Sequence, residues 1–190
     1  MAKVKKRVVD NWKKKKWYSV EADSVFDNKE ICKTVALESK NLIDRNIKKS
    51  LEKITNNIKD SGFIITFKIF KVTGGRAETK ITDLTSKGAN IKRMARRGKS
   101  KIENIINVVT KDEQKLKLKV LFISGTKFTT ELRRESRNII KEFFETEVRE
   151  KTLKETWNNI IYQKFSEKLK KKLVKLGYVN KVLVAKATVI

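Results

Sequence analysis

The 190-residue sequence contains no histidine and no proline, and it has one cysteine, Cys32. Without histidine the chain lacks the commonest general base and the commonest metal ligand. A single cysteine excludes an intramolecular disulfide and any zinc site built from several cysteines, and it favours a reducing compartment. The absence of proline, together with abundant Lys, Asn and Ile, is typical of biased codon usage rather than of a structural demand.

Long apolar runs are absent as well. No run approaches the roughly 20 residues that a membrane-spanning helix needs, and the N-terminus lacks the apolar core of a secretion signal. We therefore expect no membrane partner for this protein.

Acidic side chains are scarce. The chain has 47 Lys and Arg against 22 Asp and Glu, which leaves a formal net charge of +25. A length of 190 residues is enough for one domain with a real core. A chain of this charge repels itself and should bind an extended polyanion.

Two stretches hold much of the excess charge. Residues 1–20 contain eight Lys or Arg and one acid, Asp10, whereas residues 86–101 contain seven cations and no acid. These 36 residues therefore hold 14 of the 25 net charges. A solvated surface would spread its charge more evenly, so this concentration is typical of a nucleic-acid footprint.

The second stretch, which we call the basic segment (residues 87–101), reads KGANIKRMARRGKSK. Its spacing predicts a short helix at about 90–97 in which Arg93 and Arg97 lie one turn apart. Ile91 and Met94 would form the side that packs down. The cations of the segment are Lys87, Lys92, Arg93, Arg96, Arg97, Lys99 and Lys101.

The first stretch is predicted to be a basic arm, residues 1–16, in front of the folded part of the chain. Lysines 13–16 are bracketed by Trp12 and by Trp17 with Tyr18. An indole or a phenol can stack on a base or a sugar while lysines meet phosphates. Alternatively, Trp17 and Tyr18 begin the first buried strand, and both interpretations stay open for different rings.

Alternating apolar residues predict several strands. Short strands between residues 17 and 36 are broken by turn signals at 23–24 and 27–28, and the glycines at 74–75 predict a hairpin turn. The later predicted strands are 63–72, 76–82, 102–110, 114–124 and 179–190. In strand 114–124 the row Lys115, Lys117 and Lys119 is interpreted as a solvated sheet face rather than an RNA-facing one.

Two amphipathic helices are predicted near the C-terminus. The first, at about 130–149, buries Leu132, Ile139, Ile140, Phe143 and Phe144. On its other side Arg133, Arg137 and Lys141 should form one exposed cationic row, widened by Arg134. The second begins at Thr152, which forms a capping box with Glu155, and ends at Gly177. With no repeat or linker, the pattern predicts one α+β domain at residues 17–190.

An enzyme would need grouped carboxylates or an activated nucleophile. Asp83 and Glu103 are the candidates for a metal-dependent nucleic-acid enzyme, but Asp83 is better interpreted as a capping residue of a turn or helix. The glycines at 74–75 are followed by no phosphate-loop lysine. We therefore predict a protein that is not an enzyme, with no metal and no cofactor. A free RNA- or DNA-binding protein is the other alternative.

Several stretches resemble a small-subunit ribosomal protein family shared by archaea and eukaryotes, the S3Ae family. They occur in family order and cover most of the chain, and the length is similar to that of the archaeal form. The matching stretches are KKRVVDNWKKKKWYSVEA at the N-terminus, ITFKIFKVTGGRAET at 65–79, ITDLT at 81–85, MARRGKSKIENIINVVTKD at 94–112 and LRRESRNIIKEF at 132–143.

The resemblance implies a structural ribosomal protein on the platform of the small subunit, near the messenger exit and the 3′ end of the small-subunit RNA. The implied fold is an α+β domain with a β-barrel-like mixed sheet, a short basic helix and two C-terminal helices. The implied partners are small-subunit ribosomal RNA and neighbouring small-subunit proteins, with mRNA and initiation factors as further candidates. The implied location is the cytoplasmic ribosome.

The resemblance also changes one local prediction. At residues 43–58 apolar residues recur every three or four positions, which favours a helix, whereas the family has a strand there. We therefore predict a strand at about 45–51. Cys32, Asp44 and Glu113 stand where the family has glycine, and LGYVNKVLVAK at 176–186 replaces a basic segment of the family, so no RNA contact is expected there.

Contacts with the RNA backbone are expected from the arm, from the basic segment and from the helix at 130–149. The predicted RNA-binding residues are Lys5, Lys6, Arg7, Trp12, Lys13, Lys14, Lys15, Lys16, Trp17, Lys92, Arg93, Arg96, Arg97, Lys99, Lys101, Arg133, Arg134 and Arg137.

Overall fold

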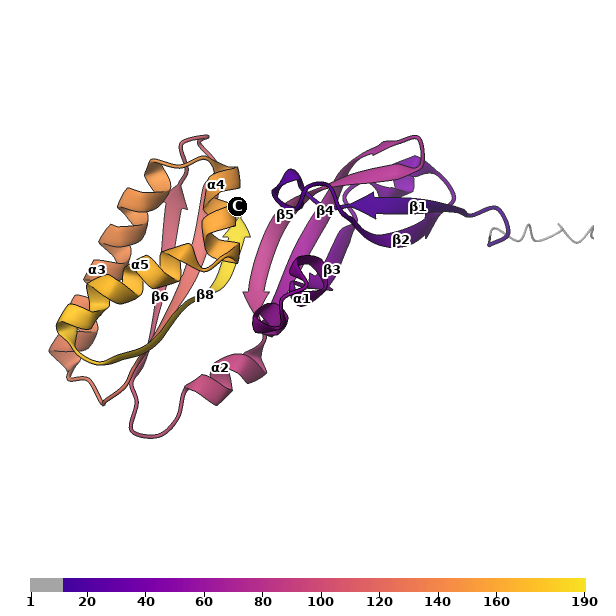
Figure 1. The fold of residues 1–190 in the computed structure, drawn as a ribbon. Helices are drawn as coiled ribbons and strands as arrows, with labels where there is room; N and C mark the ends of the chain where they lie inside the picture. Colours follow the sequence, from indigo (N-terminus) through magenta and orange to yellow (C-terminus); the bar gives the residue numbers. More distant parts are fainter. Residues whose placement is uncertain (1–11) are drawn as a thin grey trace, which may run out of the picture. The chain divides into compact units, whose positions relative to one another are not determined.

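The computed structural model describes residues 12–190, and it combines strands with helices (Figure 1). The predicted α+β class is confirmed. The strands are β1 Lys16–Glu21, β2 Glu30–Ala36, β3 Asn46–Ser50, β4 Phe63–Thr73, β5 Arg76–Ser86, β6 Lys101–Val109, β7 Lys115–Ser124 and β8 Val179–Val189. The α-helices are α1 Glu52–Thr55, α2 Gly88–Met94, α3 Thr130–Arg149, α4 Leu153–Ile161 and α5 Lys164–Leu173.

The strands form one open mixed sheet of eight strands. Six of them follow the order β2-β1-β5-β8-β7-β6, while β4 pairs with β3 and β5 off this path. The pair of β1 and β5 is parallel, and the pairs β1–β2, β5–β8, β6–β7 and β7–β8 are antiparallel. Strand β6 therefore ends the path and has β7 as its sheet partner.

The chain divides into two compact units. The first comprises residues 1–47 and 67–80, and the second comprises residues 48–66 and 81–190. Strands β4 and β5 contribute residues to both units. The proposal of an arm at 1–16 and a single domain at 17–190 stays a prediction.

The first unit has a small apolar core. It is formed by Tyr18, Val20, Ala36, Leu42, Ile69 and Ala77. Asp27 and Asn28, at the predicted turn, both have left-handed backbones, with φ of 55° and 53°. Gly74 and Gly75 also have positive φ, which a tight hairpin turn between β4 and β5 requires.

The ambiguous segment at 43–58 contains both kinds of structure. Residues 46–50 form strand β3, as the family resemblance predicted, and residues 52–55 form the single helical turn α1. Leu51 and Ile54 are buried. The spacing of the apolar residues therefore reflects one helical turn that follows a strand, and Ile58 at its end is exposed.

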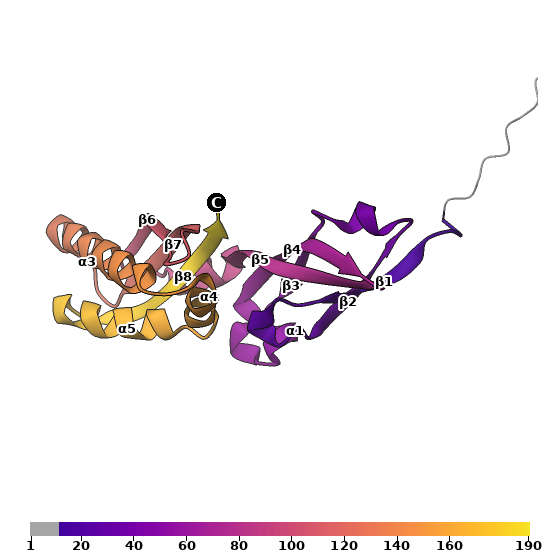
Figure 2. The same cartoon turned by 90° about the horizontal axis from the view of Figure 1, so that it is seen from above.

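The second unit packs helices on one face of its sheet. Helix α3 contacts β6 and helix α5 contacts β8, and Figure 2 shows α3 and α5 on the same side of β6, β7 and β8. Between them the rings of Phe143, Phe144 and Phe165 meet edge to face, with centroids 5.3 to 6.3 Å apart. On the strands, Ile102, Ile106, Val108, Leu116, Leu118 and Val120 are buried.

The predicted second C-terminal helix is two helices. Its capping box of Thr152 and Glu155 is confirmed, but α4 ends at Ile161 and α5 begins at Lys164. The prediction of one continuous helix is wrong because Gln163 adopts a left-handed backbone, with φ of 55°, which a helix interior does not allow. Gly177, predicted as the stop, has φ of 148°.

Two of the three residues that stand where the family has glycine have left-handed backbones. Asp44 has φ of 66° and Glu113 has φ of 59°, so the glycine-like turn is kept without glycine. Cys32 lies inside β2 and does not have positive φ. In the part of the chain from residue 12 onward, no helix is long and apolar enough to cross a membrane.

Candidate nucleic-acid interface

The basic segment begins directly after β5 and contains α2. The N–H of Lys87, the N-cap, donates to the carbonyl of Gly62 at 2.7 Å. A Cβ atom placed on Gly62 would lie 2.3 Å from Nδ2 of Asn90, so the absence of a side chain there lets α2 approach closely. The start of the segment is therefore held against the residues that precede β4.

Helix α2 is shorter than predicted. It ends at Met94 rather than at residue 97, and none of its residues is buried. Ala95 has φ of −84° and ψ of 79°, and Gly98 has φ of 79°, so neither continues a helix. A short helix gains little without a buried face, and neighbouring cations repel each other. The prediction that Arg93 and Arg97 lie one helical turn apart is wrong, because Arg97 follows the helix.

The cations of the segment are largely unpaired. Lys87, Lys92, Arg93, Arg96 and Arg97 are exposed, and Lys99 is half-buried. No ion pair between residues 12 and 190 involves any of these six side chains. Their charge is therefore available to an anion from outside the chain.

Lys101 differs from the other cations of the segment. Its Nζ lies 2.5 Å from Oε1 of Glu103, and Nζ of Lys119 lies 2.7 Å from Oε2 of the same carboxylate. Hydrogen bonds from Lys101 and then Lys119 lower the pKa of Glu103 below its ordinary value, although partial burial opposes the shift. Lys101 is thus partly neutralised inside the protein.

Buried hydrogen bonds around Ser100 hold the other end of the segment. The N–H of Ser100 donates to Oγ of Ser124 at 2.9 Å, and the N–H of Ser124 donates to the carbonyl of Ser100 at 3.0 Å. Oγ of Ser100 accepts from the N–H of Phe128 at 2.9 Å. Both serines are buried. This contact has no signature in the sequence, since a serine among lysines gives no signal of burial.

Helix α3 reaches the same point through Arg133. Its Nη2 donates to Oγ of Ser100 at 3.3 Å, and its Nε is buried with no hydrogen-bond partner among residues 12–190. Arg133 is half-buried, so the predicted exposed row of Arg133, Arg137 and Lys141 is wrong at its first member. The inward turn toward Ser100 is the physical reason.

The other two predicted cations of α3 remain on its surface. Arg134 and Arg137 are exposed, and the carbonyl of Arg137 accepts from Nδ2 of Asn104 on β6 at 3.0 Å. Leu132 and Ile139, predicted as part of the buried stripe, are half-buried. The first turns of α3 therefore lie beside the start of β6 with Arg134 and Arg137 facing solvent.

The described part of the arm begins at Trp12. The N–H of Lys15 donates to the carbonyl of Trp12 at 3.2 Å, and Nζ of Lys15 lies 4.0 Å from the centre of the Trp12 ring. Lys13, Lys14 and Lys16 are exposed. Lys5, Lys6 and Arg7 lie outside the described residues. Lys13, Lys14 and Lys16 belong to the first unit, and the basic segment belongs to the second.

The two aromatic rings at the start of β1 have different surroundings. Tyr18 is 8% exposed and belongs to the core, whereas Trp17 is 70% exposed. Trp12 is 69% exposed. The strand-start interpretation therefore holds for Tyr18, and the two indoles remain accessible for stacking.

The two carboxylates proposed for a metal-dependent enzyme lie far from each other, and each interacts with other side chains of the protein. Oδ1 of Asp83 accepts from Oγ1 of Thr188 at 2.8 Å, and Oδ2 accepts from Oγ1 of Thr85 at 2.9 Å. Strands β8 and β7 separate Asp83 on β5 from Glu103 on β6, a spacing of roughly 14 Å at about 4.8 Å per strand. Across residues 12–190, no three His, Cys, Asp or Glu side chains group as metal ligands.

A cationic face on α5 was not singled out from the sequence. Lys164, Lys168, Lys170, Lys171 and Lys172 are exposed there. Lys168 pairs with Glu147 at 3.1 Å, and Nζ of Lys172 lies 4.9 Å from the centre of the Phe143 ring. Lysines in a last helical turn stabilise the helix dipole, which explains part of this face without a ligand.

The comparison with known proteins agrees with the resemblance read from the sequence. The model of the ribosomal S3Ae family matches residues 3–190. The chain belongs to this family. Because the family is one of ribosomal proteins, the prediction that the chain is not an enzyme is confirmed.

Individual relatives match along nearly the whole chain. A protein of Staphylothermus marinus named small ribosomal subunit protein eS1 is 33% identical over 186 residues, covering 98% of this chain and 88% of the relative. Proteins of the same name from Methanobrevibacter smithii and Methanothermobacter thermautotrophicus are 28% and 27% identical, and each match covers 100% of this chain and 98% of the relative. The predicted archaeal-length member of the family is thereby confirmed.

Proposed function

We propose that this protein is a structural constituent of the small ribosomal subunit that binds small-subunit ribosomal RNA through phosphate contacts. The observation that carries the proposal is the basic segment, where six cations without a carboxylate partner in the described chain lie between two hydrogen-bonded anchors. Family membership supports the ribosomal part of the proposal.

The mechanism is the neutralisation of phosphates by a fixed cluster of cations. Arg93, Arg96 and Arg97 are exposed on a short stretch that is anchored at Lys87 and at Ser100. Anchoring lowers the conformational entropy that each contact would otherwise cost. Such contacts recognise the shape and the backbone of folded RNA more than its base sequence.

Other cations have different roles in this proposal. Lys92 and Lys99 extend the cluster, and Arg134 and Arg137 lie on the exposed side of α3. Arg133 acts as a positioning residue, since its guanidinium holds Ser100. Lys101 contributes less because Glu103 shares its charge.

The arm supplies a second kind of contact. Trp12 and Trp17 present exposed indoles beside the exposed lysines Lys13, Lys14 and Lys16. An indole stacks on an unpaired base or on a sugar, and adjacent ammonium groups meet the flanking phosphates. Lys5, Lys6 and Arg7 are proposed to extend this contact.

We further propose a position on the platform near the messenger exit, with neighbouring small-subunit proteins as partners and mRNA and initiation factors as further candidates. The family resemblance supports this position. The corresponding location is the cytoplasmic ribosome.

Sucrose-gradient fractionation at physiological salt tests the proposal. The protein is expected to migrate with the small subunit, and migration wholly free of it would contradict the proposal. A free nucleic-acid-binding protein would instead show equal affinity for RNA and DNA of the same length, without co-migration.

A further inference from the structure

Strand β6 is a nine-residue edge strand. It pairs with β7 over all nine residues, from Lys101 to Val109, without a register shift, whereas the β1–β2 and β7–β8 pairs each contain one or more shifts. Proteins usually protect such edges with bulges, prolines, short strands or unpaired lysines. Strand β6 has no bulge and no proline, and its lysine, Lys101, is ion-paired.

The hydrogen bonds that flank β6 identify the open backbone groups. The N–H of Ser124 donates to the carbonyl of Ser100, and the N–H of Thr110 donates to the carbonyl of Gln114, both at 3.0 Å. In an antiparallel pair every second residue bonds to the partner strand, so the even-numbered residues of β6 bond to β7. The backbone groups of the odd-numbered residues Glu103, Ile105, Asn107 and Val109 therefore face the open edge.

The open edge has a defined end. The N–H of Lys111 donates to the carbonyl of Lys151 at 3.0 Å, so the connection between α3 and α4 closes the edge there. Among residues 12–190, no hydrogen bond joins the outward backbone groups of 103–109 to another part of the chain. Two apolar side chains, Ile105 at 59% and Val109 at 49% exposure, are left in solvent on the same strand.

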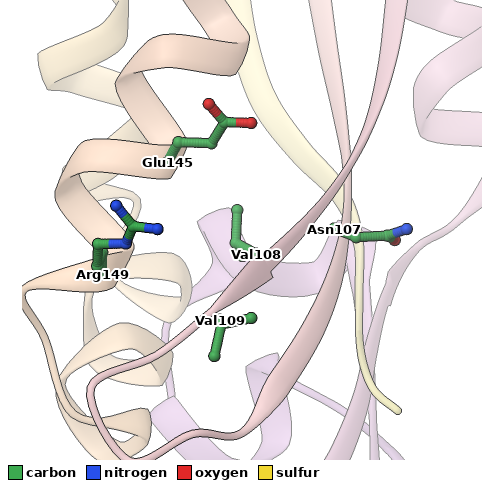
Figure 3. A pocket seen from close by; sticks show the side chains of 5 residues that line it. All are labelled: Asn107, Val108, Val109, Glu145 and Arg149. Carbon is green, nitrogen blue, oxygen red and sulfur yellow. The ribbon is translucent and has the colours of Figure 1, made fainter.

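A cavity lies beside the last residues of this edge. It has a volume of about 200 Å3 and is lined by Asn107, Val108, Val109, Glu145 and Arg149. Figure 3 shows that Glu145 and Arg149 project from α3 toward β6, while Asn107 points away from the helix. A second shallow cavity of about 310 Å3 continues along α3 and is lined by Glu142, Glu145, Thr146, Arg149 and Glu150.

This region is acidic in a strongly basic protein. Residues 142–150 carry four glutamates and one cation, Arg149. Lys151 and Lys168 contact Glu147. Nζ of Lys141 lies 3.9 Å from Oε1 of Glu145, a long ion pair between two exposed side chains. Glu145 therefore stays accessible to a ligand, together with Glu142 and Glu150. We call the open edge of β6 with these three glutamates the acidic groove. Its charge disfavours RNA and favours a cationic partner.

We propose that the acidic groove binds an extended, lysine- and arginine-rich segment of a neighbouring small-subunit protein by strand addition. The segment pairs through its backbone with Ile105, Asn107 and Val109, and its alternate side chains point to opposite faces. Apolar side chains cover Ile105 and Val109, and cationic side chains reach Glu142 and Glu145. The source of the segment rests on the proposed place of this protein in the small subunit.

Two other occupants fit less well. An RNA strand would bring phosphates toward Glu142, Glu145 and Glu150. A second copy of this chain, paired edge to edge through β6, would bring two acidic grooves together. Both arrangements place like charges in contact, which costs binding free energy.

The test uses small subunits that carry the protein with a photoreactive amino acid in place of Asn107. Two measurements are made, the identity of the crosslinked molecule and the hydrogen exchange of residues 103–109 in the subunit and in the free protein. We expect a crosslink to a lysine- and arginine-rich segment of one neighbouring protein. We also expect the outward amides to exchange slower in the subunit by at least about tenfold.

Matched variants separate charge from fold. The pair Glu142→Lys with Glu145→Lys should abolish the crosslink and the slow exchange. The control pair Glu131→Lys with Glu135→Lys, exposed on the same helix with the same charge change, should keep both. In a separate variant Asn107→Pro removes only an outward N–H, so it should abolish the slow exchange at Ile105 and Val109 while the bonds to β7 remain.

The possible results of these experiments distinguish the strand-addition proposal from the proposed function. A crosslink to RNA, a crosslink to a second copy, or equal exchange in the subunit and in the free protein overturns the strand-addition proposal alone. Loss of the crosslink in the control pair also overturns it, because charge position would then not matter. Absence of the protein from the small subunit overturns both this proposal and the proposed function.

Discussion

The six cations at 87–99 and the paired glutamates of β6 and α3 belong to the same compact unit, but only the glutamates have partners of opposite charge in the part of the chain that the structure describes. Between residues 12 and 190 every ion pair that involves a glutamate of β6 or α3 uses a lysine, and Glu103 and Glu147 each contact two. The six cations at 87–99 contact no carboxylate there. In this unit lysines thus neutralise several acidic side chains, whereas the cluster of six cations has no carboxylate partner.

Ion pairing therefore distinguishes the cations that are expected to matter for binding. A chain with a net charge of +25 has many exposed lysines, and exposure alone does not select an RNA contact. An unpaired cation on an anchored backbone keeps its full charge and loses little entropy on binding, whereas a paired one must first leave its carboxylate. Replacing unpaired cations should therefore weaken RNA binding more than replacing paired ones.

The largest effect is expected from the triple change Arg93→Gln, Arg96→Gln and Arg97→Gln. The affinity of this triple variant for a transcript of the small-subunit RNA should fall on the order of 100-fold at about 0.1 M salt, because three phosphate contacts are lost. Fluorescence anisotropy measures the affinity. The control triple Lys68→Gln, Lys141→Gln and Lys168→Gln removes the same charge from ion-paired, exposed lysines. An equal loss in both triples would show that ion pairing does not determine which cations bind RNA.

The next effect is expected at the anchor. Ser100→Ala leaves the N–H of Phe128 and Nη2 of Arg133 without their acceptor, so the free energy of unfolding should fall by about 1–3 kcal/mol. Trypsin should also cut faster after Arg96 and Arg97. Chemical denaturation and timed proteolysis measure these effects. The exposed control Ser39→Ala should stay within about 0.5 kcal/mol of the unchanged protein, and equal stability of both variants would contradict the anchor.

A smaller effect, in the opposite direction, is expected from Glu103→Gln, which should increase RNA affinity. The change frees Lys101 and Lys119 from their carboxylate, so RNA affinity should rise about twofold to fivefold. Anisotropy under the same conditions measures the gain. A fall in affinity would show that the ion pair itself positions Lys101 for RNA.

The same carboxylate predicts a pH effect. The pKa of Glu103 is lowered by Lys101 and then Lys119, so its contribution to stability is present above the ordinary glutamate pKa and is lost as the pH falls below it. Between about pH 5 and pH 3 the unchanged protein should lose more stability than Glu103→Gln. Carboxylate NMR titration and denaturant midpoints measure this, and parallel pH profiles would contradict it.

The smallest effect is expected in the turn that joins β6 to β7. Glu113→Gly relieves a left-handed backbone, so the free energy of unfolding should rise by about 0.5–1 kcal/mol after the entropy cost of glycine. RNA affinity should not change. Lys111→Gly, in the same turn but without positive φ, should instead lower stability by about 0.5–1 kcal/mol. Thermal unfolding distinguishes the two, and a rise in both would refute the strain.

Most of the fold could be predicted because its strands and helices carry clear periodic patterns. The hairpin at 74–75, the strands β6 to β8 and the capping box at Thr152 all follow from local sequence. The break at Gln163 could not be predicted, since nothing in the residue type demands a left-handed backbone there. The strand at 46–50 needed the family resemblance because a helical turn follows it at once.

The position of the candidate site in the sequence could be predicted, but its three-dimensional arrangement could not. Charge counting found residues 87–101, since no acid interrupts them. It could not show that α2 ends at Met94, that Lys101 pairs with Glu103, or that Arg133 turns inward to Ser100. The inward turn of Arg133 depends on a contact between residues distant in the sequence. The pairing of Lys101 with Glu103 depends on strand β6, which brings side chains two residues apart onto one face. The end of α2 reflects the absence of a buried helix face. Side-chain pairing, rather than composition, separates the candidate contacts.

The salt dependence of RNA affinity shows whether the arginines at 93, 96 and 97 neutralise phosphates, because its slope counts the phosphates that the protein neutralises. On a plot of log affinity against log salt concentration, the slope of the Arg93, Arg96 and Arg97 triple should be smaller in magnitude than that of the unchanged protein by roughly 2–3. The control triple at Lys68, Lys141 and Lys168 should keep the original slope within about 1 unit. Equal slopes for the unchanged protein and the arginine triple would show that Arg93, Arg96 and Arg97 neutralise no phosphates.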